Sequence, residues 1–103
     1  MIRKITYKII WDSTAKTQLK ELIESLAEIY SEKFIDHIKE EVEKHIKYIS
    51  QQPKMFPIDI LKVGNDGNYR YFNIPAIRIA YKIEPGLIIV LRIRHQSQEP
   101  KEY

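Results

Sequence analysis

The sequence predicts a single α+β domain over residues 1–103, in which an N-terminal strand and an antiparallel two-helix hairpin pack on a mainly antiparallel C-terminal sheet. Apolar side chains recur every three or four positions through residues 15–49, but at alternate positions before and after that stretch. The helical signals come before a run of strands joined by tight turns, as in α+β proteins. A chain of 103 residues is long enough for one core only.

The N-terminal half contains one strand followed by two helices. Alternation along residues 5–11 predicts the strand, with Ile5, Tyr7, Ile9 and Trp11 as its apolar positions. Asp12, Ser13 and Thr14 offer N-cap oxygens for a helix whose apolar stripe runs from Ala15 to Tyr30. Ser31 caps a second helix, which ends near Gln51 because Pro53 disfavours helix before it. A connection of about two residues makes the hairpin antiparallel.

The C-terminal half contains a loop and then strands. Pro53, Pro57 and the turn-forming residues 64–67 interrupt any regular element. Residues 68–74, 77–83 and 87–93 follow as strands, and the last two are joined by a tight reversal at residues 84–86. The last strand is apolar on both sides, which is typical of a central strand.

The register of the last hairpin decides where the arginines lie. If Ile83 pairs with Leu87, the alternate apolar residues of both strands share one face. Arg78 then lies opposite Arg92, with Arg94 on the same face. We expect this register because a slip of one residue would bring arginines onto the core face.

The basic charge is confined to the second half of the chain. Residues 1–51 carry nine basic and nine acidic side chains, whereas residues 52–103 carry eight and five, which accounts for the net charge of +3. Like charges facing each other across strands are destabilising, and a bound anion would relieve that repulsion. Arg78, Arg92 and Arg94, with Arg70 as a fourth member, are therefore the candidate residues for binding phosphate, RNA or an anionic target. The alternative is a solvated basic face with ion pairs to Glu84 or Glu99.

Other candidate residues also have structural interpretations. His95, at the end of the last strand, is either a general acid or base or a half-buried structural histidine. Tyr69, Tyr71 and Phe72 around Arg70 suit base stacking, but core and edge packing is the commoner explanation of aromatic residues in strands. We expect no metal and no cofactor: cysteine is absent, no nucleotide-binding motif occurs, and His37 and His45 are too far apart on a helix to share one ion.

Several segments, taken in order, resemble the RelE/ParE superfamily of toxins from bacterial type II toxin–antitoxin modules. The resemblance is clearest in Tyr69-Arg70-Tyr71-Phe72, in Ile77-Arg78-Ile79-Ala80-Tyr81 and in the strand that runs from Ile89 to His95. The opening strand leading into Ala15 and the helix ending at residues 48–53 extend it over nearly the whole chain. No single motif is specific, but their order and spacing together are.

The resemblance implies a compact toxin that a cognate antitoxin wraps with a helix and an extended segment. A homodimer and a heterotetramer with the antitoxin both remain open. RelE-like members bind the ribosome and cleave mRNA, whereas ParE-like members inhibit DNA gyrase without hydrolytic residues. Arg78 matches a phosphate-holding arginine, His95 keeps the histidine position, and Tyr103 lies near that of a terminal catalytic tyrosine. These three would be catalytic in a ribonuclease.

The match to the ribonuclease branch is incomplete. Tyr69 and Tyr71 stand where one ribosome-dependent subgroup has lysines, and Asn73, Gln96 and Ser97 replace other basic residues. We therefore favour a ParE-like growth inhibitor acting on DNA gyrase over a RelE-like mRNA endoribonuclease. A third hypothesis is an inactive module that only binds antitoxin. We expect a cytoplasmic protein, since no apolar run is long enough for a membrane span, and we expect the antitoxin to use the helix pair and an open strand edge.

Overall fold

A computed structural model describes residues 5–98 and 101–103 of the protein. It contains four strands and two helices within these residues, in the order β1 (Lys8–Trp11), α1 (Ser13–Ala27), α2 (Glu32–Gln51), β2 (Tyr69–Ile74), β3 (Ile77–Glu84) and β4 (Leu87–His95). This arrangement confirms the α+β class that the sequence predicts.

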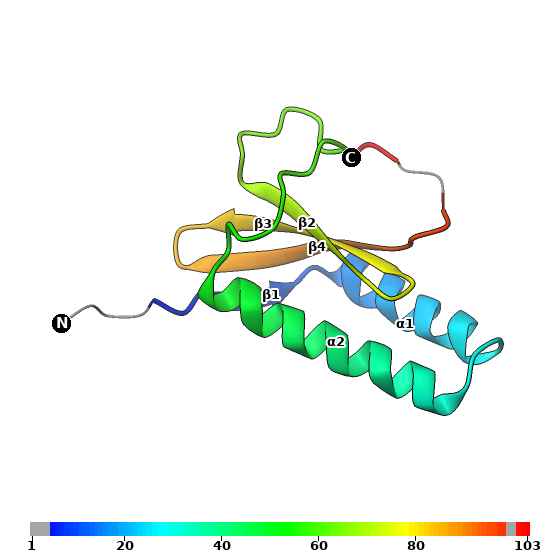
Figure 1. Ribbon diagram of the computed structural model, residues 1–103. Coiled ribbons are helices and arrows are strands. Elements are labelled where there is room, and N and C mark those ends of the chain that lie inside the picture. Colours follow the sequence, from blue (N-terminus) through cyan, green and yellow to red (C-terminus); the bar gives the residue numbers. More distant parts are fainter. Residues whose placement is uncertain (1–4, 99–100) are drawn as a thin grey trace.

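The strands form one mixed sheet with the order β1-β4-β3-β2. The β2–β3 and β3–β4 pairs are antiparallel, and β1 lies parallel to β4. Both helices cover the same side of the sheet as an antiparallel pair, whereas the long loop between α2 and β2 and the C-terminal residues lie on the other side (Figure 1). The expectation that the last strand is internal to the sheet is confirmed.

Both helices begin at the expected caps. The Asp12 carboxylate accepts a hydrogen bond from the Thr14 amide at 3.1 Å, and the Ser31 hydroxyl accepts one from the Phe34 amide at 3.2 Å. The first helix ends at Ala27, three residues before the predicted limit at Tyr30. The connection is therefore longer than the predicted two residues, because the Glu28 and Ile29 amides bond to carbonyls three residues back, at 3.3 and 3.1 Å, instead of four residues back as in an α-helix.

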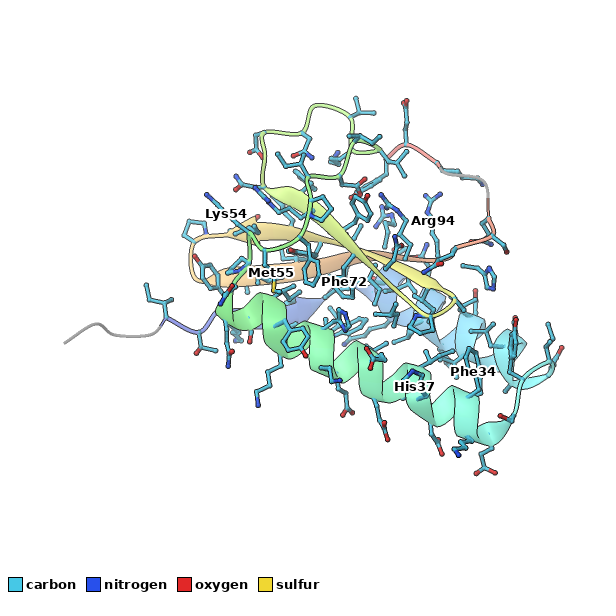
Figure 2. All side chains as sticks on the ribbon, in the orientation of Figure 1. Phe34, His37, Lys54, Met55, Phe72 and Arg94 are labelled. Carbon is cyan, nitrogen blue, oxygen red and sulfur yellow. The ribbon has the colours of Figure 1, made fainter. Side chains whose placement is uncertain are left out.

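The core lies between the helix pair and the sheet. The helices contribute buried side chains spaced three to four residues apart, and the strands contribute every second residue along β3. Phe72 lies between the sheet and α2, and Phe34 and His37 lie farther along that helix (Figure 2). No helix in the described part of the chain is both long and apolar enough to cross a bilayer.

The predicted register of the last hairpin is wrong. Glu84 pairs with Leu87 across a two-residue turn in which Gly86 adopts a φ of 67°, and Ile83 pairs with Ile88. A bulge then shifts the pairing between Ala80 and Tyr81, so that Ala80 faces Arg92.

The bulge also explains why alternation in β4 misled the prediction. Its buried residues are Ile88, Val90 and Ile93, rather than the odd-numbered apolar series from Leu87 to Ile93. Two residues separate Val90 from Ile93, so the residues that face the core are even-numbered before the bulge and odd-numbered after it. As a result, Arg78 pairs with Arg94 and not with Arg92.

Candidate functional site

The side of the sheet that faces away from the helices carries four of the eight basic side chains of residues 52–103. We call it the polar face. Strand pairing assigns to it Tyr69, Tyr71, Asn73, Arg78, Ala80, Lys82, Arg92 and Arg94. Figure 2 shows Arg94 on the side opposite α2, near the loop and the C-terminal residues. The expectation that Arg78, Arg92 and Arg94 share a face therefore agrees with the strand pairing, although the predicted register is wrong.

Asp59, in the loop above the polar face, is fully buried. Its carboxylate accepts two hydrogen bonds from the Arg78 guanidinium, at 2.8 and 3.3 Å, and one from the Leu61 amide at 3.0 Å. The Tyr103 hydroxyl donates a further bond at 2.7 Å. Two side chains from distant parts of the sequence and one neighbouring amide thus converge on one carboxylate.

This environment sets the charge of Asp59. Burial acts to raise the pKa of the carboxyl, but the hydrogen bonds from Arg78, Tyr103 and the Leu61 amide outweigh it and hold the pKa below its ordinary value. Asp59 is therefore ionised at neutral pH, and the charge of Arg78 is compensated inside the protein.

Tyr103 is held by both its main chain and its side chain. Its amide donates to the Leu61 carbonyl at 3.0 Å, and its own carbonyl oxygen accepts from the Val63 amide at 2.8 Å. Burial, followed by the hydrogen bond to Asp59, raises the pKa of its hydroxyl well above the usual value. The phenol is therefore neutral at physiological pH and acts here as a hydrogen-bond donor.

Aromatic rings enclose the cations of the polar face. The Arg78 guanidinium lies 4.0 Å from the centre of the Tyr71 ring, a close cation–π contact. The Arg92 guanidinium lies 5.7 Å from the Tyr103 ring and 3.8 Å from the Asp12 carboxylate. Unlike Arg78, neither Arg92 nor Arg94 contacts a buried carboxylate among the described residues.

The alternative prediction, a solvated basic face with ion pairs to Glu84 or Glu99, agrees with the structure only in part. Glu84 lies 3.0 Å from Lys82 rather than from an arginine. Glu99 lies outside the described residues.

Arg70 lies apart from the other arginines. It shares the helix-covered side of β2 with the buried Phe72, and its guanidinium donates to the carbonyls of Lys54 (3.1 Å), Phe56 (2.9 Å) and Gly67 (3.3 Å). These contacts tie both ends of the loop to β2. The structure therefore places Arg70 as a support for the loop and does not bring it together with Arg78.

His95 is also separated from the polar face. It pairs with the buried Ile77, which directs its ring toward the helix side at the end of β4. The Ser97 amide donates to its Nδ1 atom at 3.0 Å, so Nδ1 is the unprotonated nitrogen, and the Ser97 hydroxyl contacts the same atom. His95 and Arg94 border a hollow of about 580 Å³ that is also lined by Gln18, Glu21 and Ser25.

The three residues expected to be catalytic in a ribonuclease are thus distributed over two sites. Arg78 and Tyr103 meet at Asp59, while His95 lies on the other side of β4. Cleavage of RNA requires a base, an acid and a cation around one phosphate. The arrangement described here offers a neutralised arginine at one position and a histidine at another.

A second surface lies between the helices. Trp11, Leu19, Ile23 and Val42 line a mainly apolar groove of about 630 Å³, and Lys16, Lys20, Lys39, Glu24 and Glu43 form its rim. The two helical stripes leave this groove uncovered at their margins. Its position agrees with the expectation that the helix pair offers a groove to a partner.

Sequence reasoning overlooked Asp59 entirely. One signal could have drawn attention to it: Asp59 is the only acidic residue between Glu43 and Asp66, and it stands between Ile58 and Ile60. A carboxylate that is fully buried is almost always paired. Its partners, 19 and 44 positions away, could not be read from local spacing.

Comparison with known proteins assigns the chain to a family. Residues 9–100 match the family model described as the ParE toxin of the type II toxin–antitoxin system parDE. A search of curated proteins finds no match.

Two solved structures share the fold. The chromosomal ParDE toxin–antitoxin system from P. aeruginosa contains a chain with a TM-score of 0.66 and 11% identity, over 87% of this chain and 96% of that one. The RelBE2 toxin–antitoxin complex from Mycobacterium tuberculosis contains one with a TM-score of 0.59 and 14% identity, over 93% and 98%.

Proposed function

The chain belongs to the family of ParE toxins of type II toxin–antitoxin systems, and from this premise we propose that it arrests growth by inhibiting DNA gyrase and that a cognate antitoxin neutralises it. The proposal takes the protein to be a cytoplasmic inhibitor that acts by binding and performs no hydrolysis.

The observation that carries this proposal is the pairing of Arg78 with the buried Asp59. The arginine best matched to a phosphate-binding role already has a bidentate carboxylate partner at 2.8 and 3.3 Å. An RNA phosphate would have to displace that carboxylate and leave a buried charge without its partner, which is strongly unfavourable. A binding toxin does not need a free Arg78, so the pairing favours the gyrase inhibitor.

We place the antitoxin in the groove between the helices. Leu19, Ile23 and Val42 supply an apolar floor, and three lysines against two glutamates leave the rim with a slight positive charge. An amphipathic helix with acidic flanks fits such a groove.

The principal experiment is a supercoiling assay with purified gyrase. The protein should block supercoiling, and added antitoxin should restore it. Absence of any effect at micromolar protein would contradict the gyrase target. The double variant Lys20→Glu/Lys39→Glu should weaken antitoxin binding and leave gyrase inhibition unchanged, while Lys33→Glu, an exposed position outside the groove, serves as the matched control.

A RelE-like ribonuclease is the second candidate, supported by one observation. His95 and Arg94 border the same hollow together with Lys101, which places a histidine beside two cations. Primer extension on mRNA after induction would then show new cuts that disappear in His95→Gln. Intact mRNA during growth arrest would contradict this candidate, and normal growth on induction without antitoxin would favour the inactive module.

A further inference from the structure

The loop between α2 and β2 exposes an unusual number of apolar side chains. Ile60 is 88% exposed and Val63 62% exposed, and Met55 and Ile58 are each about half exposed. We call residues 55–63 the apolar loop. In Figure 1 the loop rises from the end of α2, passes the edge of the sheet and continues on the side opposite the helices.

This loop is held rigidly in spite of its exposure. Asp59, at its centre, is anchored by Arg78, by Tyr103 and by the Leu61 amide. The Asn65 amide group donates to the carbonyls of Asp59 (2.8 Å) and Tyr69 (2.9 Å). Two supports of different chemistry therefore hold the backbone on either side of Ile60.

Asp59 and Ile60 are adjacent in the chain but differ in their exposure to solvent. Asp59 is fully buried and Ile60 points into solvent, which reverses the usual preference of a carboxylate and an aliphatic side chain. The exposed Ile60 adds little to folding, because its apolar surface stays in water. A rigid support that presents apolar side chains lowers the entropy lost when another protein binds them.

Charge indicates the chemistry of the partner. Lys54 and Lys62 flank or lie within the apolar loop, and Arg94 lies on the polar face beside it. The Asp59 charge is compensated by Arg78. Arg92, also on this face, lies 3.8 Å from Asp12, which leaves Asp66 as the exposed carboxylate next to the loop. A partner surface that covers Ile60 and Val63 would meet these cations at its edge. Acidic side chains around an apolar pocket are the complementary arrangement.

We propose that the apolar loop is the surface by which this toxin binds its protein target, with Ile60 and Val63 inserted into an apolar pocket of the target that has an acidic rim. The inference rests on the proposed function in taking the target to be gyrase. It adds a location for the contact and separates that contact from the antitoxin groove, which lies on the helix side.

The test compares Ile60→Ser/Val63→Ser with Ile29→Ser. Ile29 lies in the connection between the helices and is 76% exposed, so its replacement removes a similar exposed side chain far from the loop. The loop variant should inhibit gyrase at least about tenfold more weakly, and growth arrest should need at least about tenfold more inducer. Ile29→Ser should match the wild type in both assays, and both variants should keep the wild-type melting temperature and antitoxin affinity.

A second pair of variants tests the charge of the partner. Ile60→Asp and Ile60→Lys both remove the apolar side chain at an exposed position where folding tolerates either. An acidic rim repels the aspartate and attracts the lysine, so Ile60→Asp should be the weaker inhibitor. Equal potency of these two variants, or the reverse order, would overturn the assignment of an acidic partner.

The assays separate failure of the loop proposal from failure of the proposed function. If wild-type protein arrests growth but does not affect gyrase, the gyrase target is wrong, and growth arrest by the loop variants still decides the role of the loop. Wild-type potency of Ile60→Ser/Val63→Ser overturns the loop proposal alone. A wild-type chain that leaves growth and gyrase unaffected overturns both.

Discussion

The two faces of the sheet are built on different principles. On the helix side, buried aliphatic and aromatic residues from both helices and from β2, β3 and β4 pack into one cluster, against which β1 contributes partly buried side chains. On the polar face, one buried carboxylate collects an arginine, a tyrosine and a backbone amide. The first arrangement tolerates gradual change because its energy is spread over many contacts, whereas the second depends on a few directional bonds.

This difference divides the protein into a part that provides stability and a part that presents a surface. The helix side holds the fold together whether or not a partner is present. The polar face keeps a loop in one conformation through Asp59 and Arg78, and that loop exposes Ile60. Four measurements test this distinction.

The largest effect is expected from Asp59→Asn. The change removes the charge that compensates Arg78 in a buried site, which should lower the free energy of unfolding by about 3–5 kcal/mol. Ile79→Ala, in the core beneath the same sheet, should cost about 2–5 kcal/mol. Urea unfolding of both variants measures the loss in the free energy of unfolding for each face, so that the two losses can be compared directly.

Asp36→Asn is the control for the loss of one carboxylate, because Asp36 is exposed on α2. It should change the unfolding free energy by less than about 0.5 kcal/mol. If Asp59→Asn behaves like Asp36→Asn, the polar face is not held by its buried ion pair.

Acid should weaken the polar face before the core. The pKa of Asp59 is lower in the folded protein than its ordinary value of 3.8, so the unfolded chain takes up a proton at a higher pH than the folded one. The stabilisation from Asp59 is therefore complete above that value and is lost as pH falls through the lower, folded pKa, with a slope of at most about 1.4 kcal/mol per pH unit.

Thermal melting of the wild type and Asp59→Asn between pH 6 and pH 2.5 measures this contribution by difference, since the other carboxyl groups titrate in both proteins. The two curves should converge as pH falls. Parallel curves would mean that Asp59 titrates equally in the folded and unfolded states.

Tyr103→Phe should have an intermediate effect. It removes the hydroxyl that donates to the Asp59 carboxylate at 2.7 Å and leaves the ring in place. A hydrogen bond to a charged group contributes about 1.5–3 kcal/mol, and calorimetry should detect the loss. Tyr30→Phe, in the exposed connection between the helices, should leave the melting temperature unchanged.

The smallest effect is expected from Arg94→Gln, and its sign is opposite. Arg78 and Arg94 face each other across β3 and β4, and like charges in that position are unfavourable. Arg94→Gln removes one of the two charges and, because Asp59 already compensates much of the charge on Arg78, should raise the free energy of unfolding by no more than about 0.2–1 kcal/mol. A loss of stability in urea would show that Arg94 has a favourable partner that outweighs this repulsion.

The helix side of the fold could be predicted from the sequence because its signals are local. Asp12 and Ser31 cap the helices as expected, and α2 ends at Gln51 ahead of Pro53. Both strands of the β2–β3 hairpin occur within one residue of their expected limits. Alternation and helical spacing depend only on neighbours along the chain, so they can be read without knowledge of the tertiary structure.

The polar face could be predicted only in part. The strand alternation placed Arg78 and Arg94 on one face, but β4 is apolar on both sides, so its sequence did not reveal the bulge that changes the pairing of Arg92. The site at Asp59 depends on contacts across 19 and 44 positions, which no local pattern encodes. Arg70 shows the same limitation, since its partners are carbonyls of a loop without regular structure.

The parallel pairing of β1 with β4 also has a consequence for folding during synthesis. Lys8 pairs with Leu87, 79 positions later in the chain. At about 5–20 residues per second, roughly 4–16 seconds of synthesis separate the first strand from its partner. Since β4 lies between β1 and β3 in the sheet, no earlier intermediate can complete the sheet. A half-made chain can form its helix hairpin, but it lacks β4 and therefore both the complete sheet and the polar face.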